Sequence, residues 1–312
     1  MSHGFSHTSV LLYECIDALH IRPDLTYADC TTGGGGHSLE IASRLSGNGR
    51  LLCFDRDEDA LAAARERLSP YLDRVTFIHE NFDRLGDVLA DLHITNLGGV
   101  LADLGCSSYQ FDTPSRGFSY QHDAPLDMRM DTASARDAAY IVNHYSEEEL
   151  RRILFEYGEE RFAPRIAARI VKARTEAPIR TTGELVALIR TAIPKDTRDS
   201  GHPAKRSFQA IRIEVNRELD AITPMIEAAA YHLVAGGRIA TISFHSLEDR
   251  LVKQAYAKLA AGCECPRDFP VCVCGKRKTV DILSRKPILP SEEELANNPR
   301  SRSAKLRVCE KL

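Results

Sequence analysis

Hydrophobic runs alternate with amphipathic stretches over the first hundred residues of this 312-residue chain. Short apolar runs, the predicted strands, lie at residues 25–30, 49–57, 75–82 and 97–105. Segments in which apolar residues have helical spacing lie between them, at 37–45, 58–68 and 83–92. Strands that alternate with helices of about ten residues indicate βαβ units and a parallel sheet. Continuous apolar runs such as GGVLA fit strands that are covered on both faces.

From about residue 107 to 216 the pattern changes to loops and helical periodicity, with no convincing strand. Helices are expected at 134–145, 146–158, 160–174 and 181–193, and a long helix from about 205 to 232. Polar capping pairs, Ser146 with Glu149 and Thr181 with Glu184, mark two of the helix starts. A strand is expected again at 234–246. The sequence therefore predicts an α/β domain, formed by 1–106 and 217–312, that is interrupted by a helical domain at 107–216.

Composition narrows the class of protein. The formal net charge is −3, so no global basic field indicates a nucleic-acid partner, and any RNA contact must come from local patches. The N-terminus lacks the pattern of a signal peptide, and no apolar stretch is long enough to cross a membrane. Four of the nine cysteines, Cys15, Cys30, Cys53 and Cys106, lie singly in strand- or helix-like contexts, which is typical of reduced thiols. We expect a cytoplasmic protein with no membrane partner.

Four consecutive glycines occur in DCTTGGGGHS, residues 29–38, between a predicted strand and a predicted helix. A glycine run costs conformational entropy on folding, so it is expected where something must approach the main chain closely. A strand, a glycine turn and a helix N-terminus together favour a cradle for a small molecule. No Gly-Lys-Ser/Thr follows the glycines, which excludes a P-loop.

Asp55 closes the second predicted strand, 20 residues after Gly35. A carboxylate at this point can accept both ribose hydroxyls of an adenosine. Nicotinamide enzymes and S-adenosylmethionine methyltransferases share this arrangement, but Ser38 stands where a dinucleotide motif has its third glycine. The local pattern therefore favours S-adenosylmethionine. A helix N-cap at the start of 57–68 is the alternative role for Asp55.

The fourth predicted strand ends in ADLGCSSYQ, residues 102–110. Ligands of open α/β sheets bind outside the carboxyl ends of the strands, next to the first glycine turn. Asp103 and the serines that follow it are therefore candidates to hold a polar substrate that accepts the transferred group. A simpler role for Asp103, as the cap of the next turn, stays open.

Several blocks of the sequence resemble the bacterial 16S ribosomal RNA cytosine-N4 methyltransferase family. The resemblance runs in the same order from residue 7 to the end of the chain. The blocks that carry it are HTSVLLYE, DCTTGGGGHS, LADLGCSS, RGFSY, APLDMRMD, YGEERFAPRIAARIV, HPAKRSFQAIRIEVNREL and ISFHSLEDRLVK. The resemblance implies a class I S-adenosylmethionine-dependent methyltransferase fold, Rossmann-like, with an inserted all-helical domain. It implies methylation of N4 of a cytidine in the decoding region of 16S rRNA, within the small ribosomal subunit, and no DNA partner.

Matched position by position, the family's cofactor contacts fall on seven residues of this chain: Gly35, Gly36, His37, Asp55, Phe82, Asp103 and Gln110. Phe82, at the end of the third predicted strand, could flank the adenine, although such a residue is also ordinary core. Two positions depart from the family pattern, because Cys106 replaces the usual valine and Tyr109 the usual proline. The second change loosens the loop that carries Gln110.

The chemistry required by this reaction suggests roles for three residues. The lone pair of a cytosine amino group is delocalised into the ring, so hydrogen-bond acceptors on its N–H protons would favour attack. We expect Asp103, Ser107 and Ser108 to hold the amino group in line with the methyl donor, with no obligatory prior deprotonation.

RNA contacts are expected on the inserted domain, which we interpret as a substrate-recognition domain. Lys205, Arg206 and Arg212 form a local basic cluster with Phe208 nearby, which suits phosphate contacts. His245 follows the fifth predicted strand and is a candidate to face a flipped base. A histidine that is hydrogen-bonded at a strand end is the alternative.

Two C-x-C pairs stand six residues apart in CECPRDFPVCVC, residues 263–274. The four thiolates could bind zinc, but zinc sites usually have C-x₂₋₄-C spacing, so the sequence assigns no metal, and a structured loop with prolines fits equally well. Two rival functions also stay open. These are a nicotinamide-dependent oxidoreductase and a non-enzymatic ribosome assembly factor.

Overall fold

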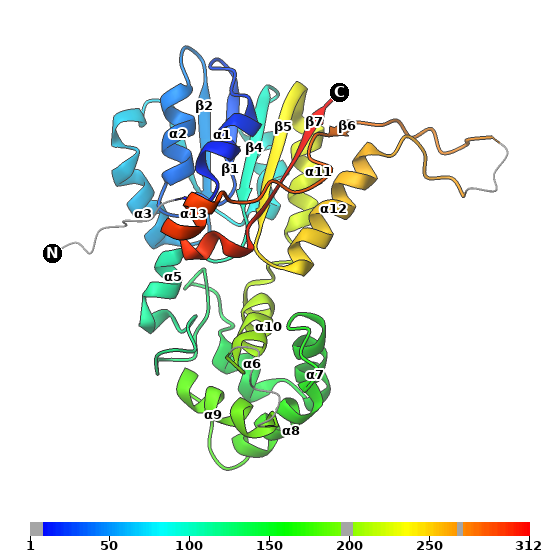
Figure 1. The fold of residues 1–312 in the computed structure, drawn as a ribbon. Coiled ribbons are helices and arrows are strands. Elements are labelled where there is room, and N and C mark those ends of the chain that lie inside the picture. The colour runs from blue at the N-terminus through cyan, green and yellow to red at the C-terminus, as the bar shows by residue number, and fades with distance from the viewer. Residues whose placement is uncertain (1–8, 195–201, 267–270) are drawn as a thin grey trace. The chain divides into compact units, whose positions relative to one another are not determined.

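The computed structural model of the protein describes residues 9–194, 202–266 and 271–312, and its helices and strands are drawn in Figure 1. The chain divides into two compact units. The larger unit comprises Met1–Gly105 and Leu219–Leu312, and the smaller comprises Cys106–Glu218. These limits lie within two residues of the domain limits expected from the sequence.

The larger unit is built on one seven-stranded sheet with the order β3-β2-β1-β4-β5-β7-β6. Its strands are β1 (Thr26–Asp29), β2 (Arg50–Asp55), β3 (Val75–His79), β4 (Leu97–Asp103), β5 (Leu233–Ser243), β6 (Val280–Ile282) and β7 (Lys305–Lys311). Neighbours among the first five are parallel, whereas β7 is antiparallel to both β5 and β6. The chain reverses its direction of winding between β1 and β4, as in doubly wound sheets. The predicted Rossmann-like fold class is confirmed.

Two hydrophobic clusters cover the two faces of this sheet, because successive strand residues point to opposite sides. In β4, Val100 and Ala102 belong to one cluster and Leu101 to the other. The first cluster includes residues of α4 (Leu85–Asp91), α11 (Ile222–His232) and α12 (Ser246–Ala260). The second includes residues of α1 (Leu12–Leu19), α2 (Gly36–Arg44) and α3 (Glu58–Arg67). The result is the three-layered arrangement seen in Figure 1. The short helix α13 (Glu292–Asn297) precedes β7.

The smaller unit is helical and has its own buried core. Its helices are α5 (Ser108–Asp112), α6 (Ala138–His144), α7 (Glu147–Glu156), α8 (Ala163–Arg174), α9 (Thr182–Ala192) and α10 (Lys205–Asn216). The two predicted capping pairs are confirmed. The Ser146 and Thr181 side chains accept from the backbone N–H of Glu149 and Glu184, and those glutamates accept from the cap backbone in return.

The long helix expected over 205–232 is wrong, because the chain breaks it into α10 and α11. Arg217 has φ of 50°, a left-handed conformation that ends α10. The Asn216 side chain stabilises the break. Its amide donates to the carbonyl of Met128 and its oxygen accepts from the N–H of Met130, at 2.8 Å each. The third predicted strand is also shorter than expected, since β3 ends at His79.

Within the part of the chain that the structure describes, no helix is both long enough and apolar enough to span a bilayer.

Candidate cofactor site and substrate contacts

The glycine turn between β1 and α2 is shaped mainly by contacts within the protein. Gly33 and Gly35 have φ of 51° and 78°, which favour glycine. A Cβ on Gly35 would lie 3.2 Å from the backbone of Ala64, and one on Gly36 would lie 1.9 Å from the Ser9 hydroxyl. Tight internal packing therefore explains two of the four glycines. This corrects the expectation that an approaching ligand is what requires the whole run.

The side chains of the two residues that follow the turn, His37 and Ser38, are held by hydrogen bonds to other parts of the protein. The His37 ring is buried, and its Nε2 lies 3.0 Å from the carbonyl oxygen of Val10. The Ser38 hydroxyl donates to the buried Asp29 carboxylate at 2.6 Å. Burial raises the pKa of Asp29 to about 6, and Ser38 and the Thr31 N–H oppose that rise. Both side chains at the start of α2 are thus engaged in holding β1, the turn and the N-terminal segment together.

Asp55 ends β2 and lies across from the glycine turn. Its Oδ2 accepts from the Gly33 N–H at 2.8 Å and its Oδ1 accepts from the Asp57 N–H at 2.9 Å. A carboxylate has about four lone-pair sites, so two stay available for hydroxyl donors. Burial raises the pKa of Asp55 to about 6. The alternative role as helix N-cap is wrong, because α3 is capped by Asp57, which accepts from the Asp59 N–H.

Asp103 ends β4 among other carboxylates. Its backbone N–H donates to the Thr31 hydroxyl at 2.6 Å. Burial raises the pKa of the Asp103 carboxyl well above its usual range, and the charges of Asp29, Glu248 and Glu294 raise it further. These carboxylates accept from hydroxyl or backbone donors, as when Glu294 accepts from the Leu11 N–H at 2.9 Å. The group is strongly electronegative and suits a cationic ligand.

Four buried polar atoms of the larger unit lack a hydrogen-bond partner among the described residues. They are Asn81 Oδ1, Asp103 Oδ1, Ser243 Oγ and His245 Nε2. Asp103 and Ser243 end the strands β4 and β5, and Asn81 and His245 follow β3 and β5 by two residues. Buried polar groups are almost always hydrogen-bonded, so an unpaired group calls for an explanation such as a bound ligand. The carboxyl ends of β3, β4 and β5 thus carry the acceptors and donors of an incomplete polar site.

Phe82 lies in this region but is not part of a strand. It is the first residue of the 3₁₀ helix Phe82–Arg84, three residues beyond β3, so its expected place at the strand end is wrong. The ring is half-buried and packs against the cluster that contains α4 and α11. One part of the ring therefore belongs to the core, and the rest is accessible.

Three further predicted residues lie in the smaller unit, at the start of α5. Ser107 is the N-cap of this helix, and its hydroxyl accepts from the Gln110 N–H at 3.3 Å. The Gln110 side chain is buried and accepts in return from the Ser107 N–H at 3.1 Å. Ser108 is the first helical residue. Ser107 and Gln110 therefore bind each other, a local capping role that the sequence interpretation did not consider.

The predicted basic cluster divides into exposed and paired members. Lys205 and Arg206 are exposed at the start of α10, where Arg206 donates to the carbonyl of Glu159 at 3.0 Å. Arg212 instead forms a bidentate ion pair with Glu218, with both N–O distances 2.9 Å and both side chains largely buried. This ion pair compensates the charge of Arg212 within the unit, and the predicted RNA contact of Arg212 stays a prediction. Phe208 is also buried in the helical core.

His245 acts as the N-cap of α12. Its Nδ1 accepts from the Glu248 N–H at 3.4 Å, and the Glu248 carboxylate accepts from the His245 N–H in a reciprocal capping box. Its Nε2 lies 3.1 Å from Glu248 Oε1 but outside hydrogen-bond geometry. The hydrogen-bonded alternative therefore accounts for one ring nitrogen, and the other lies within ion-pair distance of Glu248 without a hydrogen bond.

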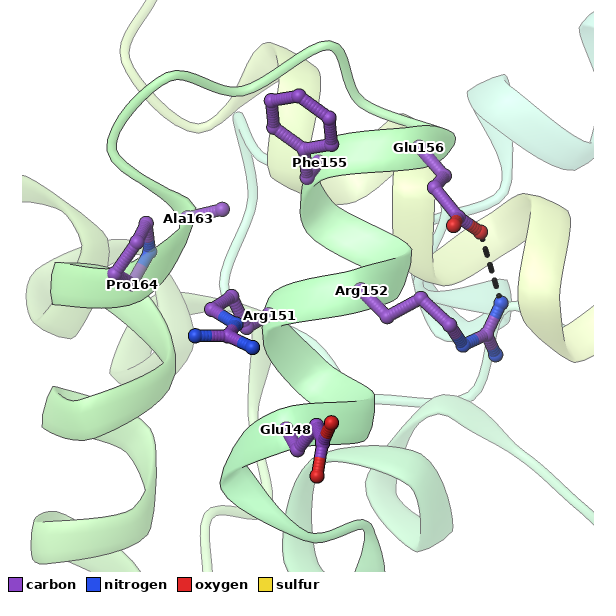
Figure 2. Close-up of a pocket in the computed structure, with 7 residues that line it drawn as sticks. All are labelled: Glu148, Arg151, Arg152, Phe155, Glu156, Ala163 and Pro164. Atoms are coloured by element: carbon purple, nitrogen blue, oxygen red, sulfur yellow. Dashed lines mark hydrogen bonds and ion pairs between the residues drawn. The ribbon is translucent and has the colours of Figure 1, made fainter.

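A pocket on the smaller unit, between α7 and the start of α8, is shown in Figure 2. Phe155 is 66% exposed there. Arg151 points from α7 towards Pro164, whereas Arg152 points away and pairs with Glu156 at 3.1 Å. An exposed aromatic ring beside an arginine is a surface on which a nucleobase can stack.

Sequence reasoning missed five residues of the strand-end region: Asp29, Asn81, Ser243, Glu248 and Glu294. Asp29 carried a usable signal, since it directly precedes the glycine turn. Glu294 carried none, because it comes from a helix more than 190 residues further along the chain than Asp103.

Comparison with known proteins identifies relatives over the whole chain. The model of the MraW methylase family matches residues 4–312. Ribosomal RNA small subunit methyltransferase H of Clostridioides difficile (strain 630) is 56% identical over 309 residues, which cover 99% of each chain. The protein of the same name from Symbiobacterium thermophilum is 54% identical over 310 residues, covering 99% of this chain and 98% of that protein. The resemblance found in the sequence is thus confirmed, and the chain belongs to the MraW methylase family.

Proposed function

We propose that the protein is an S-adenosylmethionine-dependent methyltransferase of ribosomal RNA, which methylates N4 of a cytidine in the decoding region of 16S rRNA. The observation that carries the proposal is the set of unpaired buried polar atoms at the carboxyl ends of β3, β4 and β5. These atoms lie in a chain of the methylase family, and the relatives that match it over its full length bear the name of a small-subunit rRNA methyltransferase.

The donor set of the larger unit fits S-adenosylmethionine. When bound, this cofactor supplies a sulfonium-activated methyl group. Asp55 has lone pairs left to accept the two ribose hydroxyls, and the glycine turn beside it gives the ligand access to the backbone of Gly33. The carboxylates around Asp103 complement the positive charges of the amino group and the sulfonium. Phe82 keeps its proposed role beside the adenine, and Gly35, Gly36 and His37 hold the turn in shape.

Ser38 supports this choice over a nicotinamide dinucleotide. Its hydroxyl donates to Asp29 and its side chain is fully buried, at a position where a dinucleotide motif needs glycine for close helix–strand packing. If the protein were an oxidoreductase, NADH would shift its melting temperature and S-adenosylmethionine would not.

Asp103 is the proposed catalytic residue that accepts from the cytosine amino group. Its Oδ1 is buried and unpaired, so it can accept without first breaking a bond to the protein. As an acceptor it would localise the nitrogen lone pair and stabilise the positive charge that develops on nitrogen. Ser107 and Ser108 remain in the proposal as further partners, although Ser107 uses one lone pair to cap α5.

RNA contacts are proposed for Lys205 and Arg206, which are exposed, and for His245 through its Nε2. The target base must leave its stack to reach the methyl donor. The rim of the pocket at Arg151 and Phe155 joins the proposal as an additional contact of the helical unit.

The test is incubation of the protein with labelled S-adenosylmethionine and small ribosomal subunits that lack the mark. Digestion to nucleosides and mass spectrometry should reveal N4-methylcytidine at one position of 16S rRNA. Asp103→Asn should abolish incorporation, and Asp249→Asn, a carboxylate of α12 paired with Arg307 of the same unit, is the matched control. Methylation at carbon 5 of cytosine, or of another base, would refute the proposed acceptor. Subunit binding without any incorporation would identify an assembly factor instead.

A further inference from the structure

The segment between α12 and β6 extends away from the sheet, as the orange trace in Figure 1 shows. Its described residues, 261–266 and 271–279, are mostly exposed. Val271 and Val273 are 69% and 73% exposed, so the described residues of the segment build no apolar core of their own. Short segments that cannot bury a core usually depend on a covalent or metal cross-link for a defined structure.

Four cysteine side chains converge in this segment. Cys263 and Cys265 belong to its outgoing arm, and Cys272 and Cys274 belong to its returning arm. All four sulfur atoms lie within 4.8 Å of one another. The Sγ–Sγ distances are 3.4 Å for Cys263–Cys272, 3.5 Å for Cys272–Cys274, 3.8 Å for Cys263–Cys274 and 3.9 Å for Cys265–Cys272. Residues 267–270, between the two pairs, lie outside the described residues.

These distances match a tetrahedral metal site better than a pair of disulfides. A disulfide joins two sulfurs at about 2.05 Å and leaves the other pair independent. With zinc–sulfur bonds of about 2.3 Å, a tetrahedron has sulfur–sulfur edges of about 3.8 Å. Cys272 lies at 3.4–3.9 Å from each of the other three sulfurs, which is the relation that one shared central ion requires.

The backbone around the sulfurs also suits thiolates. The N–H groups of Cys265, Val273 and Glu264 lie 3.3 Å from the sulfurs of Cys263, Cys265 and Cys274 respectively. Such N–H donors stabilise negative charge on sulfur and orient the lone pairs of each ligand. Lys276 adds a positive charge next to the cluster, and its ion pair with Glu264 links the two arms.

We propose that Cys263, Cys265, Cys272 and Cys274 bind one structural zinc ion. Four thiolates fill a tetrahedral coordination sphere and leave no position for a water or substrate, so the site is structural. The ion would cross-link the two arms, whose described residues bury no apolar core. Sequence spacing alone did not assign this site, because each pair has a single intervening residue. The convergence of the pairs is a property of the folded loop.

The test is elemental analysis of the full-length, untagged protein, purified with thiols kept reduced. We expect about one zinc per chain. Cys272→Ser and Cys274→Ser should each lose most of the zinc, and Cys106→Ser, which changes a thiol outside the cluster, should retain it. Replacement of zinc by cobalt(II) should give the visible absorption of a tetrahedral thiolate site. This absorption should be absent from the double variant that carries both Cys272→Ser and Cys274→Ser.

A second measurement does not depend on the variants. Chelation should speed trypsin cleavage at Lys276, Arg277 and Lys278 several-fold, and added zinc should restore protection. Protein that contains no zinc after reduction and incubation with zinc would overturn the proposal. Unchanged zinc content in the double variant, or a different metal in the wild type, would overturn it as well. Because the cluster lies on an exposed segment, the variants should keep the melting temperature of the larger unit within a few degrees.

Discussion

Replacement of Asp103 by asparagine should stabilise the ligand-free protein and abolish methylation at the same time. Burial of the carboxyl raises its pKa well above the usual range, three other carboxylates raise the pKa further, and the buried Oδ1 has no hydrogen-bond partner. Its charge is therefore unfavourable in the folded state unless a ligand compensates it. Asparagine has nearly the same shape and removes the charge.

Asparagine leaves a polar group at the same position, so the gain comes only from the part of the desolvation cost that belongs to the charge, on the order of 1–3 kcal/mol. For a unit of roughly 200 residues this corresponds to an increase in melting temperature on the order of 5 °C. The sign depends on pH. The pKa is higher in the folded state than in the unfolded state, so the Asp103 carboxyl lowers the stability of the wild type as pH rises above about 4, and the variant lacks this contribution. The advantage of the variant should be larger at about pH 8 than at about pH 5.

Differential scanning calorimetry of both proteins without ligand, at two pH values, measures this difference. Asp249→Asn is the control with the opposite sign. Burial acts to raise the pKa of Asp249, but its hydrogen bonds and ion pair with Arg307, at 2.6 Å, hold the pKa below the usual range. That variant should melt at a lower temperature. A lower or unchanged melting temperature for Asp103→Asn, or methylation at the wild-type rate, would refute the reasoning.

Four further predictions follow from the same structure. Asp55→Ala should weaken S-adenosylmethionine binding in calorimetry by about 100-fold. This factor corresponds to the loss of two hydrogen bonds to a charged group, each taken at the low end of the energies found for such bonds. The affinity of the wild type for S-adenosylmethionine should fall as pH decreases below about 6, because Asp55 has a pKa of about 6 and its protonation removes the charge of the acceptor. An affinity that does not change with pH would contradict this. Arg212→Met should destabilise the helical unit by about 3–5 kcal/mol in urea unfolding, since it leaves Glu218 buried and unpaired, and Arg212→Met with Glu218→Met should recover most of the loss. Phe155→Ala should weaken binding to small subunits several-fold with an unchanged melting temperature, and equal binding would exclude the pocket on α7 and α8 as an RNA contact.

Local patterns determined the order and type of most elements. The alternation of apolar runs and amphipathic segments predicted β1 to β4 and α2 to α4, because burial on both faces of a sheet imposes a period that can be read without knowledge of the partners. The capping pairs at Ser146 and Thr181 were predictable because both partners lie within one helical turn. The positions of Asp55 and Asp103 at two strand ends were predictable because strand ends next to a glycine turn meet at one edge of a parallel sheet.

Tertiary structure decided which of the predicted residues are available. Arg212 has the sequence context of a phosphate contact, but Glu218 neutralises it after a turn at Arg217 that helical periodicity cannot foresee. Two glycines of the run are required by Ala64 and Ser9, which are not neighbours in sequence. The carboxylates around Asp103 and the four sulfur atoms beyond α12 are also brought together only by the fold. The type of each residue and its local context determine what its side chain can do chemically. Its distance to other groups, its burial and the compensation of its charge arise only when separate segments pack together.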